Sequence, residues 1–165
     1  MIEDVTIENI DEVLPLIAEY QEFYGVENID LEKNSNFFSQ FTNENNDSGS
    51  LYLFRRNGQV IGFITIYKGF SSTQAESVAI LNDLYIKVDH RGNGFAKKLI
   101  NHALNTAKSK GYSRLQWLTA HNNKIASIYM MTLTLLKARG FSMQLKLNVK
   151  NSYNWFTLPF ELSSS

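Results

Sequence analysis

The sequence predicts one domain of mixed α/β class spanning residues 1–165, and three observations lead to this prediction. The chain has 165 residues, and a single domain of that size buries enough apolar surface to fold without cross-links. Segments with strand periodicity alternate with segments of helical periodicity. At the centre a strand, a glycine-rich turn, a helix, a strand and another helix follow one another, an order typical of a sheet covered by helices.

The first third of the chain predicts one short strand, Val5 to Ile7, and two helices. In the first helix the apolar residues fall on one face, with Asn9 or Asp11 as the N-cap. Pro15 interrupts this pattern, and we expect it to kink or delay the helix because proline has no N–H to donate. The second helix is predicted from Asp30 to Phe41.

The middle third predicts a hairpin and a long strand. The hairpin joins Leu51 to Arg56 with Gln59 to Tyr67, because Asn57-Gly58 suits a turn whose two central residues need positive φ. The long strand runs from Val78 to Val88. Its apolar run is interrupted by Asn82-Asp83, which indicates a bulge or bend.

The last third predicts two helices, each followed by a glycine, and three strands, which brings the total to about seven strands and four helices. The helices run from Phe95 to Lys110 and from Asn123 to Arg139, and the strands are Arg114 to Thr119, Phe141 to Val149 and Tyr153 to Phe160.

Composition excludes several classes of function. Cys is absent, which excludes disulfides, a thiolate nucleophile and cysteine metal sites. His90, His102 and His121 share no metal-ligand spacing, so we expect no metal. The acidic start lacks a signal-peptide core and no apolar run approaches the ~20 residues of a membrane span, so we expect a cytoplasmic protein without a membrane partner. Zero net charge argues against general nucleic-acid binding.

Charge is distributed unevenly along the chain. Residues 1–50 hold 12 Asp and Glu and one Lys, a balance of −11, whereas residues 51–165 hold 4 Asp and Glu and 15 Lys and Arg, a balance of +11. One interpretation is that the basic part faces an anionic ligand and the acidic part attracts a cationic one. The alternative is that these charges lie on solvated faces and mix once the chain is folded.

The most informative segment is Asp89 to Ala96, which connects the long strand to a helix. A strand that turns through Gly92 and Gly94 into a helix aims several backbone N–H groups at one point, where the helix dipole adds roughly half a positive charge. Glycine also permits positive φ and close approach of a ligand. The segment therefore predicts an anion cradle, although glycine-rich turns without a ligand are common.

The spacing within this segment distinguishes it from two familiar phosphate loops. It lacks the Gly-Lys-Ser/Thr end of a Walker A loop and the spacing of Gly-x-Gly-x-x-Gly. It matches Arg-x-x-Gly-x-Ala, and this resembles the acetyl-CoA pyrophosphate loop of the GNAT superfamily of N-acetyltransferases, most of all the branch that acetylates small amines, polyamines or basic protein tails. The resemblance covers most of residues 10–130, and its further parts are Tyr20-x-x-Phe23-Tyr24, Phe70-Ser71-Ser72, Leu81 to Ile86, Trp117 to Ala120 and Asn123-x-x-Ala126.

The resemblance implies a twisted mixed sheet whose two central strands splay apart, with acetyl-CoA as co-substrate. In the family, pantetheine fills the gap and pairs with the long strand, here through Leu84 and Ile86, while pyrophosphate faces the amides of residues 91–96. The cofactor-binding residues implied in this way are Leu84, Tyr85, Ile86, Arg91, Gly92, Asn93, Gly94, Phe95, Ala96, Asn123 and Tyr129.

Acetyl transfer from a thioester to an amine needs a neutral amine and hydrogen-bond donors for the carbonyl oxygen, and it benefits from a proton for the departing thiolate. The expected carbonyl donor is a backbone N–H near Tyr85 or Ile86. The resemblance implies a Tyr on the last helix as proton donor. One alignment places Tyr129 there and another places Met130, and one residue turns a helical side chain by 100°. We predict Tyr129, and core packing is its alternative role.

Asp83 is the predicted base, acting directly or through water. The alternative is that Asp83 is a bulge residue that hydrogen-bonds the main chain. Some related amine acetylases carry Glu where this chain has Asn82, so a strong base is missing there and Asn82 is predicted to contact the substrate.

Aromatic residues are predicted to line the acceptor site. Tyr20, Phe23 and Tyr24 fit a wall whose ring faces also hold cations, with core packing as the alternative. Phe70 belongs, by resemblance, to a loop over that site.

The sequence thus predicts an N-acetyltransferase that moves an acetyl group from acetyl-CoA to a primary amine by direct attack, without a covalent enzyme intermediate. The acidic first third favours a cationic acceptor such as a polyamine, an amino acid or a lysine-type amine in a basic peptide. A non-catalytic acyl-CoA-binding sensor is the alternative, and a binder of another phosphate ligand is a third hypothesis. The apolar segment from Tyr153 to Leu158 predicts an edge strand that pairs in a homodimer or closes the chain's own sheet.

Overall fold

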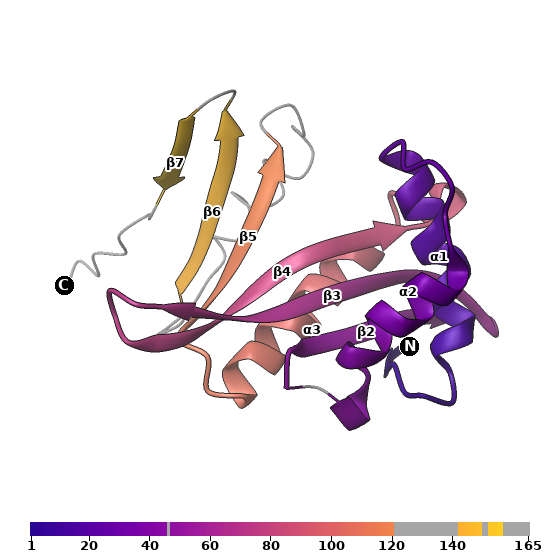
Figure 1. Ribbon diagram of the computed structural model, residues 1–165, viewed down its shortest axis with the longest axis horizontal. Helices are drawn as coiled ribbons and strands as arrows, with labels where there is room; N and C mark the ends of the chain where they lie inside the picture. The colour runs from indigo at the N-terminus through magenta and orange to yellow at the C-terminus, as the bar shows by residue number, and fades with distance from the viewer. Residues whose placement is uncertain (46, 121–141, 150–151, 157–165) are drawn as a thin grey trace.

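A computed structural model describes residues 1–45, 47–120, 142–149 and 152–156 (Figure 1). The strands are β1 (Ile2–Asp4), β2 (Gly49–Arg56), β3 (Gln59–Ser71), β4 (Glu76–Ile86), β5 (Arg114–Ala120), β6 (Ser142–Val149) and β7 (Ser152–Phe156). The α-helices within these ranges are α1 (Ile10–Phe23), α2 (Leu31–Phe38) and α3 (Phe95–Ser109), with 3-10 turns at Ser39–Phe41, Asn43–Asn45 and Val88–His90. The helix predicted from Asn123 to Arg139 lies outside the described residues.

The strands form one mixed sheet in the order β1 to β7. Neighbouring strands are antiparallel from β1 to β4, parallel from β4 to β6 and antiparallel between β6 and β7. Helices α1 and α2 lie on one side of the sheet and α3 on the other (Figure 1). The mixed α/β class predicted from the sequence is confirmed. β7 ends the strand order, and pairing of a second copy along it stays a prediction.

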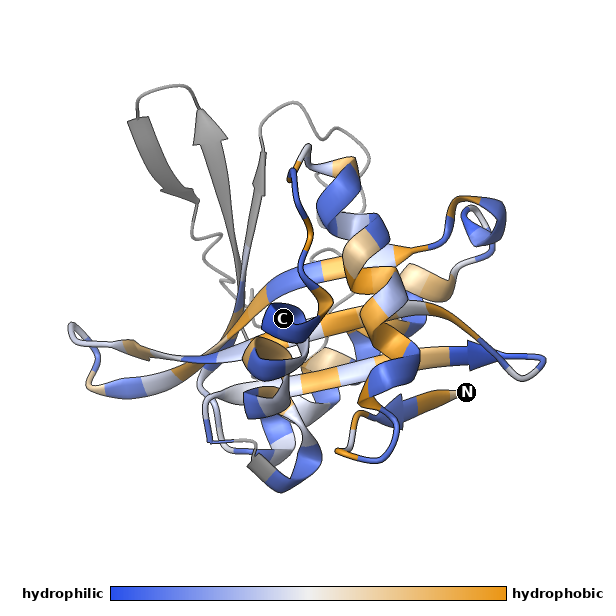
Figure 2. Ribbon diagram, turned by 45° about the vertical axis from the view of Figure 1, so that its right-hand side comes forward, coloured by the Kyte–Doolittle hydropathy of each residue, from blue (hydrophilic) through white to orange (hydrophobic). Residues whose placement is uncertain are grey.

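Each face of the sheet carries its own hydrophobic core, and Figure 2 shows apolar residues along the central strands. On the α3 face Trp117 is buried and packs in the core. On the other face Val13 and Ile17 of α1 and Phe63 of β3 belong to one hydrophobic core. The residues that α3 buries are those its helical spacing predicts: Leu99, Ile100, Ala103, Leu104 and Ala107.

The first strand differs from the prediction. β1 is Ile2–Asp4, not Val5 to Ile7, because these three residues pair with Tyr52–Phe54 of β2. The chain then turns, since the side chain of Asn9 accepts a hydrogen bond from the backbone N–H of Thr6 at 2.8 Å. α1 begins directly after Asn9 and continues through Pro15, so the proline does not delay the helix.

The hairpin and the long strand follow the prediction with shifted ends. Asn57 and Gly58 both have positive φ, as their turn requires. β3 extends to Ser71 and β4 ends at Ile86, two residues earlier than expected, where the chain enters a 3-10 turn. The predicted bulge is confirmed, since Thr65 pairs with Asp83 and Ile66 with Leu81, which leaves Asn82 as the extra residue.

Strands β4 and β5 separate soon after they pair. Their pairing joins Ala79–Leu81 to Leu115–Trp117 and goes no further, although β4 continues to Ile86 and β5 to Ala120. Figure 1 shows the two strands diverging. Residues 83–86 therefore pair with β3 on one edge and, among the described residues, with no strand on the other. The sheet thus contains a splayed pair at its centre.

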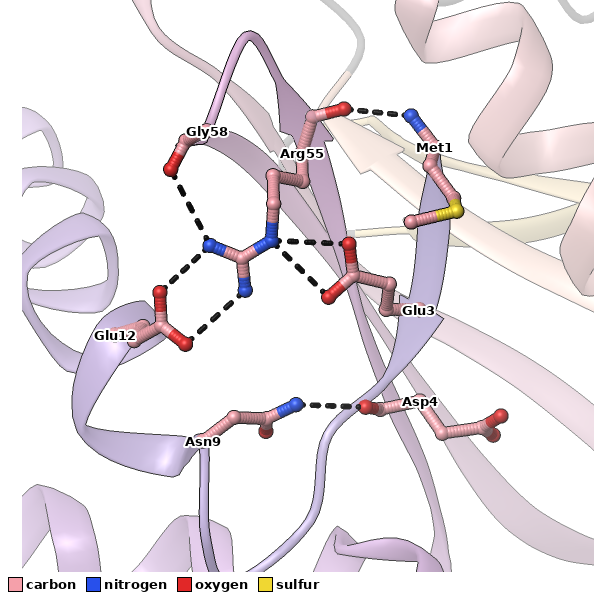
Figure 3. A network of polar contacts seen from close by, with 7 residues as sticks. All are labelled: Met1, Glu3, Asp4, Asn9, Glu12, Arg55 and Gly58. Atoms are coloured by element: carbon pink, nitrogen blue, oxygen red, sulfur yellow. Dashed lines mark hydrogen bonds and ion pairs between the residues drawn. The ribbon is translucent and has the colours of Figure 1, made fainter.

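Arg55 binds two acidic side chains from the first third of the chain (Figure 3). Its Nε donates to Glu3 at 3.0 Å and its terminal nitrogens donate to both carboxylate oxygens of Glu12. These contacts tie β1, α1 and the β2–β3 hairpin together. Opposite charges from the two parts of the sequence therefore mix in the fold at this point, as one of the two interpretations of the charge distribution expects.

Within the described ranges no helix is both long and apolar enough to cross a bilayer. In the same ranges no group of three or more His, Cys, Asp and Glu side chains is placed to hold a metal ion.

We expect His102 on α3 to make the stability of the fold depend on pH. Its ring lies 4.4 Å from the ring of Tyr52, and its buried Nε2 has no hydrogen-bond partner among the described residues. Burial lowers the pKa of His102 below the usual 6.5. As pH falls below about 6.5 the unfolded chain therefore binds this proton first, and the stability present at higher pH declines.

The measurement is the thermal unfolding midpoint between about pH 8 and pH 5. His102→Gln should lose less stability than the wild type on acidification because its side chain does not titrate. His90→Gln, in the turn before α3, is the matched control and should follow the wild type. Equal acid sensitivity of the wild type and His102→Gln would contradict this assignment.

Candidate acetyl-CoA and acceptor site

The turn between β4 and α3 has the geometry that the sequence predicts for an anion cradle. Gly92 has φ +76° and Gly94 has φ +74°, both in the left-handed region that favours glycine. Gly94 is the N-cap of α3, and no side chain among the described residues caps this helix end. Lys97 and Lys98 lie in the first turn, which contains no acidic residue. The local field at this helix end therefore favours an anion.

The backbone N–H groups of residues 92–96 have no hydrogen-bond partner among the described residues. Such amides at a helix N-terminus are available to phosphate oxygens. The amide of Arg91 is not available, because it donates to the carbonyl of Val88 at 3.1 Å. The cradle is thus one residue shorter than the segment 91–96 expected from the sequence.

The side chain of Arg91 is held by the end of β4. Its Nε donates to the carbonyl oxygen of Ile86 at 2.9 Å. Its guanidinium carbon lies 5.6 Å from the centre of the Tyr85 ring and 5.9 Å from that of Phe23. Because these rings lie toward α1, Arg91 fixes the loop against the strand and the first helix.

Asp83 lies beside two tyrosines on the α1 side of the sheet. Burial, the negative charge of Asp83 and hydrogen bonding with Asp83 and Tyr24 raise the pKa of Tyr20 far above its usual value. Burial, and after it the charge of Asp83, raise the pKa of Tyr67 to about 12. Both phenols therefore stay protonated near neutral pH. Asn82, the bulged residue, donates from its amide to the Asp83 carboxylate at 3.0 Å.

The aromatic residues predicted to line the acceptor site lie together at the end of α1. The ring of Tyr20 lies 4.9 Å from that of Tyr24 and 5.9 Å from that of Tyr85. Phe23 and Tyr24 are 68% and 64% exposed, so they are not core residues. Tyr20 by contrast packs against the core around α1. The packing alternative thus holds for Tyr20, and the substrate-wall role of Phe23 and Tyr24 stays a prediction.

Phe70 is not brought together with these residues. It pairs with Ser77 near the far end of the β3–β4 hairpin and is 75% exposed. Thr65, which faces Asp83, lies five positions before it on β3, roughly 17 Å at ~3.4 Å per residue. The predicted placement of Phe70 in a loop over the acceptor site is wrong in this structure, because β3 continues through Ser71 as a strand.

The sequence of this chain matches a known protein family. A model of the acetyltransferase (GNAT) family matches residues 13–132. The chain belongs to the GNAT acetyltransferase family. Family members use acetyl-CoA as co-substrate, so this chain is an acetyl-CoA-dependent N-acetyltransferase. The enzyme hypothesis is thereby favoured over a non-catalytic sensor, and the branch of the family is left open.

Individual relatives agree with this placement in the GNAT family. The uncharacterized N-acetyltransferase YhfO of Bacillus subtilis (strain 168) is 34% identical over 118 residues, which are 71% of this chain and 77% of that protein. The D-amino-acid N-acetyltransferase HPA3 of Saccharomyces cerevisiae (strain ATCC 204508 / S288c) is 29% identical over 99 residues, 56% of this chain and 62% of that protein. A crystal structure of a probable acetyltransferase has a TM-score of 0.73 at 25% identity and covers 99% of both chains.

Three residues beside the candidate site are not among those predicted from the sequence. Thr65 faces Asp83 in the strand register, and its fully buried hydroxyl has no hydrogen-bond partner among the described residues. Tyr67 lies two positions further along β3, and Glu19 on α1 contacts the end of β4. The placement of Thr65 and Tyr67 could be predicted from the sequence, because side chains alternate along a strand and Phe63, Thr65 and Tyr67 therefore lie on the same face.

Two predicted residues of the site, Asn123 and Tyr129, lie outside the described residues, as does the competing Met130. Their roles stay predictions.

Proposed function

We propose that this GNAT acetyltransferase transfers the acetyl group of acetyl-CoA to a cationic primary amine by direct attack, without a covalent enzyme intermediate. One observation carries the proposal. The bulge at Asn82 sets a carboxylate, that of Asp83, among protonated tyrosines on the α1 side of the strand whose other edge is open. A carboxylate with aromatic neighbours is suited to hold and deprotonate an ammonium group.

The co-substrate would be held by backbone more than by side chains. Pantetheine would pair with the open edge of β4 at Leu84 and Ile86. The pyrophosphate would accept hydrogen bonds from the amides of residues 92–96, with Lys97 and Lys98 adding positive charge near this end of α3. A backbone N–H near Tyr85 would donate to the thioester carbonyl as negative charge develops on its oxygen.

The reaction would need two proton transfers, one from the ammonium of the acceptor and one to the departing thiolate. Alkyl amines have a pKa near ~10, so the acceptor arrives as an ammonium and must lose a proton before attack. Asp83 is the proposed base, directly or through a water. The hydroxyl of Tyr20 beside it would hold the carboxylate in place, because its raised pKa keeps it a donor. Tyr129 is the proposed proton donor to the departing thiolate.

Support for a cationic amine acceptor comes from charge. Residues 1–50, which include α1 and α2, have a balance of −11, and the pairs made by Arg55 and Lys87 involve three of these acids, Glu3, Glu12 and Glu19. The remaining negative charge attracts cations. One relative acts on D-amino acids, and an amino acid is one member of the proposed acceptor class.

Direct attack is tested by mass spectrometry of the intact protein. Incubation with acetyl-CoA alone should leave the protein mass unchanged, and addition of a diamine should yield the acetylated amine and one thiol per amide formed. A covalent acetyl group on the protein that later moves to the amine would contradict direct attack. Acetylated amine without any such adduct is the expected result.

A further inference from the structure

The carboxylate of Glu19 joins helix α1 to the end of β4. One of its oxygens pairs with the ammonium of Lys87 at 3.2 Å. Its other oxygen accepts a hydrogen bond from the hydroxyl of Tyr85, also at 3.2 Å. Both partners lie more than 60 positions away in the sequence, so this one side chain bridges two distant parts of the fold.

The last two residues of β4, Tyr85 and Ile86, and Lys87 directly after them are each held by a side chain from outside the sheet. Tyr85 and Lys87 are held by Glu19, and the carbonyl of Ile86 between them accepts a hydrogen bond from Arg91. The Tyr85 ring is almost fully buried and lies 5.9 Å from the ring of Tyr20. The guanidinium carbon of Arg91 lies 5.6 Å from the centre of the same Tyr85 ring.

These contacts connect the two halves of the site. Glu19 directly precedes Tyr20, the residue beside Asp83 on the acceptor side. Tyr85 and Ile86 belong to the open edge of β4, on the side proposed for acetyl-CoA. Rotation or sliding of α1 relative to this edge changes the distance between amine and thioester. A displacement of about 1 Å in such geometry costs roughly 100-fold in rate.

We propose that Glu19 is a positioning residue for acetyl transfer, holding the acceptor side of the site in register with the acetyl-CoA side. It touches neither reactant and acts through Tyr85 and Lys87. This inference rests on the proposed function, because it presupposes that the acceptor lies by Asp83 and the thioester by the edge of β4.

The test compares Glu19→Gln and Glu19→Ala with the wild type in steady-state kinetics. Gln keeps the size of the side chain and an acceptor for Tyr85 but loses the pairing with Lys87, whereas Ala loses both contacts. We expect kcat to fall roughly 3-fold in Glu19→Gln and at least roughly 10-fold in Glu19→Ala, with both KM values within about 2-fold of the wild type. Glu22→Gln, an exposed carboxylate on the same helix, is the matched control and should keep the wild-type kcat.

A double-mutant cycle with Tyr85→Phe separates positioning from general loosening of the fold. Because Glu19 acts through the Tyr85 hydroxyl, the effects of Glu19→Ala and Tyr85→Phe on kcat should be less than additive. Unchanged kcat in Glu19→Ala, or fully additive effects, would overturn the inference. So would a loss of kcat matched by a proportional fall in acetyl-CoA affinity, measured by calorimetry. A wild type that binds acetyl-CoA and acetylates no amine would instead contradict the proposed function itself, and the inference with it.

Discussion

Replacing Gly94 by glutamate is expected to abolish acetyl-CoA binding, and with it acetyl transfer. Gly94 has φ +74°, and beyond its chain neighbours and its own helix backbone no atom of the described residues lies within 4 Å of the position a Cβ would take, so the new side chain would project freely at the N-terminus of α3. Its carboxylate would occupy the positive helix end where we place the pyrophosphate and would repel it. The expected loss of affinity is at least roughly 100-fold.

The same substitution at Gly111, at the other end of α3, controls for the backbone strain that a residue other than glycine brings at positive φ. Gly111 has φ +72°, and a Cβ there would likewise meet no atom of the described residues within 4 Å beyond its chain neighbours. Glutamate at either position adopts a left-handed conformation that costs ~1–2 kcal/mol. Calorimetry should therefore show acetyl-CoA binding to Gly111→Glu and none to Gly94→Glu. Equal loss in both variants would assign the effect to folding, and binding by Gly94→Glu would contradict the cradle.

Replacing Asp83 by asparagine is expected to lower kcat/KM for the amine by roughly 10²–10⁴-fold, the range for a positioned base. Asn has the same shape and can still contact Tyr20, so the bulge at Asn82 should persist and acetyl-CoA should bind as before. The deficit should shrink as pH rises toward ~10, because the amine then arrives without its proton. The measurement is the rate of thiol release as a function of pH.

A matched control for Asp83 lies on the same strand. Glu76→Gln also removes one carboxylate from β4, at the end remote from the acceptor side, where Glu76 lies 3.9 Å from Arg114. This variant should keep the wild-type rate with the amine. A rate for Asp83→Asn within about 3-fold of the wild type over the whole pH range would leave Asp83 with a structural role at the bulge only.

The part of the site around α3 is predictable from the sequence because its signals are local. Gly92 and Gly94 adopt positive φ, and the helix begins at Phe95 as predicted. The bulge at Asn82 is also predictable, since two polar residues break an apolar strand. In each case the physical cause is contained within a few neighbouring residues.

The acceptor side is less predictable because its contacts join residues far apart in the chain. Nothing near Glu19 in the sequence indicates that it binds Lys87 and Tyr85. The contact of Arg91 with the carbonyl of Ile86 is not predictable from the sequence either. An arginine in this loop that binds a phosphate would have the same sequence pattern.

Strand ends account for the other differences between prediction and structure. β1 forms three residues earlier than predicted because Ile2–Asp4 pair with Tyr52–Phe54 of β2, and the chain then turns at Thr6, whose N–H donates to the side chain of Asn9. β3 runs on to Ser71 because β4 starts at Glu76 and continues the pairing to that point, which carries Phe70 away from the acceptor side. Partner strands, and not local propensity, set these boundaries.

The proposed acetylation of a cationic primary amine is tested by the initial rate of thiol release from acetyl-CoA with matched acceptors. An unbranched diamine and the monoamine of the same chain length would be compared at low and high salt, beside an amino acid and a lysine-rich peptide. We expect a higher kcat/KM for the diamine than for the monoamine, and we expect added salt to reduce this difference. No thiol release with any of these amines, from a protein that binds acetyl-CoA, would contradict the proposed acetylation.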